Sequence, residues 1–279
     1  MNLGIARISR RTVTIAAAFV GLVSLVLGAH AALNMRSLDA AKAIATEHTG
    51  SIGQGASRVA LVIGNGHYPD ASAPLAQPIN DARGLTAALR GKGFDVDVVE
   101  DATRDDMDRA IVRLKDKIRP DTVVMLFFGG YGVQVGRESF MIPVDARIWK
   151  EADVRRDGVS IEQVLDAMTE KGARAKLVVV DASRRNPYER RFRSFSHGLA
   201  PISAPENALI LTSATPGKVA DDGKGQYSVL VTELLNNLNS QSGAATAFNK
   251  TRISVSRASE GEQVPQVSSS LMEDVRIGG

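Results

Sequence analysis

Two apolar runs of the chain end in side chains that are capable of nucleophilic or acid–base chemistry. The run VVMLFF ends at Phe128, and Tyr131 follows after two glycines; the run LVVV ends at Val180, and Asp181 and Ser183 follow. Continuous apolar runs of this length are typical of strands buried on both faces of a parallel sheet. Ligands and reacting groups lie just beyond the C-terminal ends of such strands. If the two strands are neighbours, the phenol and the hydroxyl face each other across a crevice, although a strand-end serine or tyrosine is, taken alone, more often an ordinary loop residue.

The composition limits the chemistry further. The 279 residues include no cysteine, which excludes a thiol nucleophile, Cys-ligated zinc and disulfides. The formal net charge of +3 is accounted for by Arg7, Arg10 and Arg11, which precede the first apolar segment. The basic balance therefore does not indicate a nucleic-acid partner, and we predict none. No metal or other cofactor is predicted either.

Residues 1–33 have the pattern of a targeting segment or a membrane anchor. Thr12 to Gly28 contains no charged residue and follows the three arginines. A cleaved signal peptide is one interpretation, since Ala29-His30-Ala31 matches the small-x-small cleavage pattern. An uncleaved anchor is the other, since the uncharged stretch 12–29 approaches the length of about 20 apolar residues that spans a bilayer. Both predict a periplasmic or secreted protein, in the second case one tethered to the inner membrane.

After a polar, glycine-containing linker (34–57), the segment 58–279 alternates between strand and helix patterns and is expected to form one domain. Alternation of this kind predicts a mainly parallel sheet with helices on both faces. Asp81 falls near the start of one expected helix, where a carboxylate suits the helix dipole. The strand over 94–99 has mixed polarity and is expected near an edge, and the tail after 244 is kept in the domain without an assigned element. The expected strands are 58–64, 94–99, 123–128, 138–143, 177–180 and 207–212, and the expected helices are 80–91, 104–118, 160–172 and 227–238.

Seven stretches resemble motifs of the caspase-like peptidase superfamily, in family order. They are RVALVIGNGHY (58–68), LAQPINDAR (75–83), VVMLFFGGYG (123–132), FMIPVDAR (140–147), VVVDASRRNP (178–187), HGLAP (197–201) and QVPQVSSSL (263–271). The chain is similar to peptidase family C14, close to its bacterial metacaspase-like (orthocaspase) group. The resemblance implies a caspase-like three-layer α/β sandwich with a mainly parallel six-stranded sheet.

The same resemblance points to two substitutions. The glycine-rich loop of the family carries a histidine general base, and here that position is Tyr131. The D-A-C-R motif of the family carries the nucleophilic cysteine, and here that position is Ser183. The acidic residues that resemble those forming a pocket for Arg or Lys side chains are present as Asp81 and Asp181.

These substitutions predict that the family's cysteine-type endopeptidase activity is absent or very weak. A serine hydroxyl needs a positioned base. A tyrosine has an unperturbed pKa of about 10, so roughly one phenol in a thousand is ionised at pH 7. No lysine lies in the FGGYG loop to lower that pKa. A rewired base, His67 or His197, stays open as an alternative.

Three functions follow as hypotheses. The first is a catalytically inactive pseudopeptidase that binds a peptide or protein partner, with an Arg or Lys side chain held by Asp81 and Asp181. The second is a weak serine-dependent hydrolase that uses Ser183 with a rewired base. The third is a membrane-tethered interaction scaffold. The basic stretch from Arg184 to Arg193 is expected to be a solvated loop, with contact to an acidic partner or a membrane surface as the alternative.

Overall fold

A computed structural model of the chain describes residues 57–69, 74–185, 187–188, 198–220, 225–238 and 243–278. The predicted leader and all but the last residue of the predicted linker lie outside these ranges. Within them, no helix is both long enough and apolar enough to cross a membrane.

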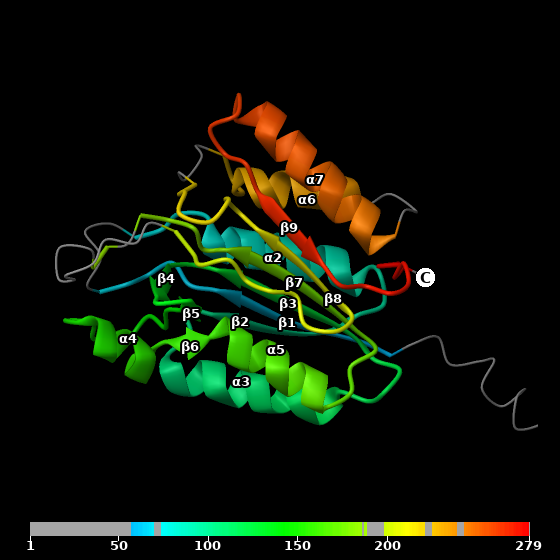
Figure 1. The fold of residues 1–279 in the computed structure, drawn as a ribbon, viewed down its shortest axis with the longest axis horizontal. Helices are drawn as coiled ribbons and strands as arrows, with labels where there is room; N and C mark the ends of the chain where they lie inside the picture. The colour runs from blue at the N-terminus through cyan, green and yellow to red at the C-terminus, as the bar shows by residue number, and fades with distance from the viewer. Residues whose placement is uncertain are drawn as a thin grey trace, which may run out of the picture. The chain divides into compact units, whose positions relative to one another are not determined.

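A six-stranded sheet forms the centre of the domain (Figure 1). Its order is β2-β1-β3-β7-β8-β9, and every neighbouring pair is parallel except β8 and β9. The mainly parallel sheet is as predicted, and β2 lies at an edge as its mixed polarity indicated. The sixth strand, β9, comes from the tail to which the sequence assigned no element. The strands are β1 (Arg58–Gly64), β2 (Asp95–Glu100), β3 (Val123–Gly129), β7 (Ala175–Asp181), β8 (Ala208–Thr212) and β9 (Gln266–Ser269).

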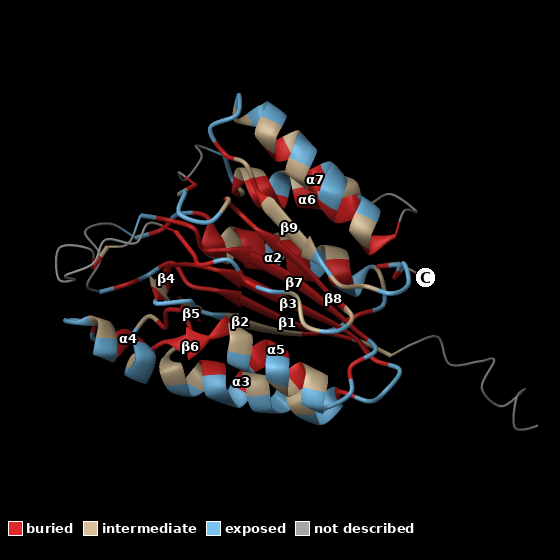
Figure 2. Cartoon of the chain, in the orientation of Figure 1, coloured by how far each residue is buried: buried red, intermediate tan, exposed pale blue. Residues whose placement is uncertain are grey.

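The two central strands, β3 and β7, are buried at every position, which explains their continuous apolar composition (Figure 2). Successive side chains point to opposite faces of the sheet. Phe127 and Val179 therefore pack in the core on one face, while Phe128 and Val180 pack in the core on the other.

Helices cover both faces of the sheet, as the three-layer prediction requires (Figure 1). One face carries α2 (Pro78–Arg90), α6 (Val229–Leu238) and α7 (Ala244–Ala258). The other carries α3 (Arg104–Lys117) and α5 (Ile161–Glu170). The helix α7 was not predicted, and neither was the short helix α4 (Glu151–Asp157).

Local signals fix where these helices begin. Ser160 accepts a hydrogen bond from the amide of Gln163 (3.2 Å) and so starts α5 where the sequence predicted. Helix α2 begins at Pro78, packed against the last residue of β1. A Cβ at Gly64 would lie 2.4 Å from the carbonyl oxygen of Pro78, so only glycine permits this close approach.

A second, smaller sheet extends from the end of β3. It contains β4 (Gly132–Val135), β5 (Glu138–Met141) and β6 (Val159–Ser160), paired antiparallel. Of these, the sequence predicted only the strand at β5. Because β3 ends at Gly129 and β4 begins at Gly132, the glycine-rich loop is held between the large sheet and the small one.

Candidate functional site

The C-terminal ends of β3 and β7 lie side by side, as the site prediction required. Their pairing continues past the strands: the amide of Gly130 donates to the carbonyl of Asp181 (3.2 Å), and the amide of Gly132 donates to that of Ala182 (3.0 Å). The loop that carries Tyr131 is therefore joined through its main chain to the loop that follows β7. These two loops carry Tyr131 and Ser183, and we call the region around them the crevice.

Tyr131 is fixed in this crevice by a second tyrosine that the sequence did not single out. The amide of Tyr131 donates to the hydroxyl oxygen of Tyr68 (3.0 Å), and that hydroxyl donates to the carbonyl of Ile142 (3.0 Å). The two rings pack edge to face with centroids 4.8 Å apart. Burial raises the pKa of Tyr68 far above its ordinary value, so its hydroxyl stays protonated. In the sequence Tyr68 stood out only as the last residue of the family-like stretch 58–68, in the loop after the first strand.

Ser183 is buried at the end of β7 without an activating partner. Its hydroxyl oxygen makes no hydrogen bond to any described residue. Its amide donates to the hydroxyl of Ser213 (3.3 Å), and its carbonyl accepts from the amide of Ala220 (2.7 Å). The main chain of Ser183 is thus held firmly, while no base is hydrogen-bonded to its hydroxyl.

The structure brings the two predicted acidic residues together. Asp81 lies in the first turn of α2, but it is fully buried and accepts a hydrogen bond from the amide of Ser228 (2.9 Å) instead of capping its own helix. One oxygen of Asp81 and one of Asp181, Oδ2 in each, have no hydrogen-bond partner among the described residues. Burial, and then the neighbouring carboxylate of Asp181, raise the pKa of Asp81 to about 8. Asp81 therefore keeps its proton at neutral pH.

Arg184 supplies a positive charge close to this pair. Its Nη1 donates to the carbonyl of Gly130 (3.0 Å) and to the carbonyl of Asp181, and it lies 3.7 Å from Asp181 Oδ1. Arg184 is buried, so the expectation that it belongs to a solvated loop is wrong. The interaction that outweighs solvation is with two carbonyl groups at the strand ends. Arg185 is exposed as expected, and Arg190 to Arg193 lie outside the described residues.

The structure describes only one of the two histidines considered as rewired bases. His67 is exposed, and its Nδ1 lies 2.6 Å from Asp101 Oδ2, while it makes no hydrogen bond to Ser183. His197 lies outside the described residues. Among the residues that the structure describes, no group of three or more His, Asp or Glu side chains is arranged to hold a metal ion.

Comparison with known proteins agrees with this geometry. The family model of the caspase domain, peptidase C14, matches residues 57–276. The chain belongs to this family. Among curated proteins, the human mucosa-associated lymphoid tissue lymphoma translocation protein 1 is 29% identical over 133 residues, and its mouse homolog is 30% identical over 133 residues. These matches cover 47% of this chain and only 16% of either relative's length.

Solved structures support the caspase fold over most of the chain. The structure of pro-sf-caspase-1 superposes with a TM-score of 0.60 at 16% identity and covers 82% of this chain and 93% of that one. Caspase-1 from Spodoptera frugiperda gives a TM-score of 0.59 at 15% identity, with 82% and 92% covered. At these identities the similarity shows the fold alone. The predicted family and the predicted caspase-like sandwich are both confirmed.

Proposed function

We propose that this caspase domain is a pseudopeptidase, which holds an Arg or Lys side chain of a peptide or protein partner and does not cut its main chain. One observation carries the proposal: among the described residues, a buried serine hydroxyl has no base bonded to it, and the buried Asp81 and Asp181 each have a side-chain oxygen without a partner. The first half of that arrangement argues against hydrolysis. The second half argues for a cationic ligand.

Hydrolysis by Ser183 needs two things that the described residues do not provide at its hydroxyl and its amide. A serine hydroxyl becomes nucleophilic when a base accepts its proton, and Ser183 has no such hydrogen bond among the described residues. The developing oxyanion needs free amide donors. The amide of Ser183, a natural candidate for that task, already donates to Ser213.

A basic side chain would satisfy the acidic pair. Buried carboxylate oxygens without partners are costly, and a guanidinium or ammonium group offers them charge-assisted hydrogen bonds. Arg184 lies near Asp181 Oδ1, and Oδ2 of Asp81 and Oδ2 of Asp181 have no hydrogen-bond partner in the part of the chain that the structure describes. Both carboxylates are enclosed, so the ligand must displace covering groups as it enters. Binding of a cation would release the proton held by Asp81. The affinity for a cationic ligand is therefore expected to rise as the pH approaches about 8.

The first test measures hydrolysis of fluorogenic peptides that end in Arg or Lys. The full chain is compared with the double variant Tyr131→His/Ser183→Cys. We expect no turnover by the unchanged chain and measurable turnover by the double variant, since the variant restores an imidazole and a thiol to the crevice. Turnover by the unchanged chain that disappears in Ser183→Ala would refute the pseudopeptidase.

The second test measures ligand binding by isothermal titration. Arg-containing peptides are compared with matched peptides in which citrulline, a neutral isostere, replaces Arg. We expect the Arg peptides to bind more tightly, and at least part of this preference to be lost in the Asp181→Asn variant, which keeps the size of the side chain and removes its charge. The absence of any binding by Arg peptides would refute the ligand-holding role even if hydrolysis is absent.

One observation favours a serine-dependent hydrolase as the second candidate. Asp101 orients the ring of His67 through Nδ1 (2.6 Å), which is how a carboxylate orients the base of a catalytic triad. The obstacle is that His67 is exposed and Ser183 is enclosed. This candidate requires turnover that is lost in both His67→Gln and Ser183→Ala. Turnover that survives His67→Gln would eliminate this pairing.

A further inference from the structure

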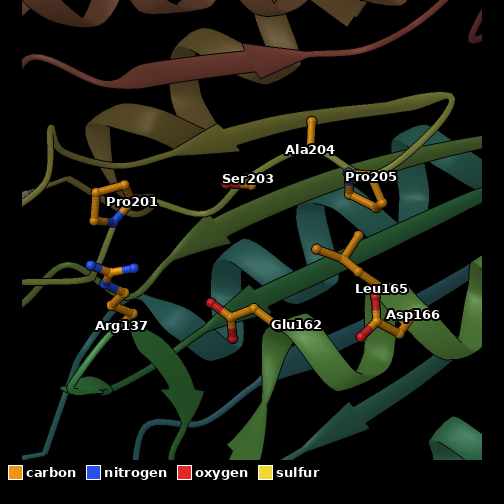
Figure 3. A pocket seen from close by; sticks show the side chains of 8 residues that line it. All are labelled: Arg137, Glu162, Leu165, Asp166, Pro201, Ser203, Ala204 and Pro205. Atoms are coloured by element: carbon orange, nitrogen blue, oxygen red, sulfur yellow. The ribbon is translucent and has the colours of Figure 1, made fainter.

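A cavity of about 640 Å³ lies between α5 and the segment that leads into β8 (Figure 3). Helices α3 and α5 pack over this face of the sheet, and Leu199 and Ile202 of the segment pack into the same core as Ile210 of β8. Other residues of the segment are left to line the cavity. We call this cavity the α5 pocket. The residues that line it include Arg137, Glu162, Leu165, Asp166, Pro201 and Pro205.

One wall of the α5 pocket is acidic. Glu162 and Asp166 are four residues apart on α5 and therefore lie on the same face of the helix, and Figure 3 shows both side chains with Leu165 between them. None of the ion pairs formed by the described residues includes either carboxylate. Burial raises the pKa of Glu162, and the nearby carboxylate of Glu138 adds to this effect. A cation held at this wall would favour the charged form of Glu162, and neither carboxylate of the wall is in an ion pair among the described residues.

The walls of the pocket are tied together before any ligand arrives. The amide of Ser139 lies 3.2 Å from both carboxylate oxygens of Glu162, and the hydroxyl of Ser139 accepts from the amide of Ala200 (3.1 Å). Ser139 therefore links α5 to the facing segment. A preformed cavity costs less ordering on binding than one that must assemble, and its volume is within the range of about 300 to 1,000 Å³ that is usual for ligand sites.

The remaining lining selects among cationic ligands. The two prolines provide apolar surface along which the stem of a Lys or Arg side chain can lie, with its charged end at the carboxylates. Arg137 lies at the β4–β5 turn and is exposed. It would repel a polycation such as a polyamine and attract the carbonyl groups or a carboxylate of a peptide. The chemistry fits an extended peptide segment that has one basic side chain.

We propose that the α5 pocket is a second binding site, separate from the crevice, which takes an extended segment of a partner protein through one Lys or Arg side chain. The crevice and the α5 pocket have no residue in common. The proposal therefore stands whether or not the crevice binds a ligand.

The absence of cysteine allows a direct test. A Ser203→Cys variant of the full chain, labelled with an environment-sensitive fluorophore at the exposed rim of the pocket, reports on occupation of this site. The probe is a pool of acetylated pentapeptides with arginine at the centre and random residues on both sides. The matched pool has citrulline at the centre. A label at Ala258→Cys, at the exposed end of α7 on the other face of the sheet, is the control for non-specific contact.

We expect the arginine pool to shift the emission at position 203 and not at 258, with an affinity about tenfold higher than that of the citrulline pool. Glu162→Gln/Asp166→Asn should lower the affinity for the arginine pool about tenfold. Asp166→Asn alone should also lower it, and this variant serves as the test if the double variant folds poorly. Glu170→Gln, an exposed position of the same helix, and Asp81→Asn in the crevice should leave it unchanged. Any of three results would overturn the proposal. They are the absence of an emission shift at position 203 up to about 1 mM peptide, an equal response to both pools, and loss of the response in Asp81→Asn.

Discussion

Replacing Asp81 with asparagine is expected to change how the stability of the domain depends on pH. Asp81 has an ordinary pKa of 3.8 and a folded-state pKa of about 8. Between these two values the unfolded chain has lost the proton and the folded chain keeps it, so the stability that the protonated group provides is lost as pH rises through this window. The loss is about 1.4 kcal/mol per pH unit, or between about 3 and 4 kcal/mol from pH 5 to pH 8. Asparagine cannot ionise, and its side-chain oxygen can still accept from Ser228.

The assay is urea unfolding of the unchanged chain and of Asp81→Asn at pH 5, 6, 7 and 8, with the free energy of unfolding taken by linear extrapolation. The difference in stability, variant minus unchanged chain, should grow in favour of the variant by about 3 to 4 kcal/mol across this range. Asp121→Asn, at an exposed loop position, should shift the curve by only a few tenths of a kcal/mol. Parallel curves for the unchanged chain and Asp81→Asn would mean that Asp81 carries no proton in the folded state, and the electrostatic account of the crevice would then be wrong.

Three further substitutions test which local contacts stabilise the domain. Gly64→Ala should lower the free energy of unfolding by about 2 kcal/mol or more, since its Cβ would clash with the carbonyl of Pro78. Gly91→Ala, whose Cβ would meet only ordinary contacts at 3.5 Å, should be neutral or slightly stabilising. Equal effects of the two substitutions in thermal melts would contradict this prediction. Thr103→Ala should cost about 1 kcal/mol by removing a capping box, and no loss in urea unfolding would show that the cap is dispensable. Phe127→Ala should cost about 3 to 5 kcal/mol through a buried cavity, and a loss below 1 kcal/mol would mean that the core closes around it.

The parts of the fold that the sequence predicted are those in which one local pattern dominates. The strands β3 and β7 are continuous apolar runs, and α5 has both an apolar stripe and a serine cap. The element β9 was missed because QVSS is half-exposed and carries no long apolar run; it becomes a strand by pairing with β8. The element β6 has only two residues and is defined by its pairing with β5. Such elements depend on tertiary contacts that no short window of sequence contains.

The sequence pointed to the positions of the candidate site residues but not to the interactions that these residues make. The strand-end rule and the family resemblance together located Tyr131, Ser183, Asp81 and Asp181. Neither showed that Arg184 turns inward, because an arginine in a basic stretch is normally solvated. Its burial depends on two carbonyl groups that are 54 and 3 residues away in the chain. Only the folded structure brings these groups together.

The geometry of the crevice rests largely on main-chain groups around positions 131 and 183. Its loops are joined by main-chain hydrogen bonds from Gly130 and Gly132 to the end of β7, and the hydroxyl of Tyr68 binds the amide at position 131. Main-chain contacts of this kind persist when a side chain is exchanged for one of similar size. The proposed absence of the nucleophile and of the base is therefore compatible with intact loops, which is why a cysteine and a histidine placed there are expected to give cleavage. Tyr68→Phe, which removes the hydroxyl and leaves the amide of position 131 without its partner, should disturb the crevice in any variant.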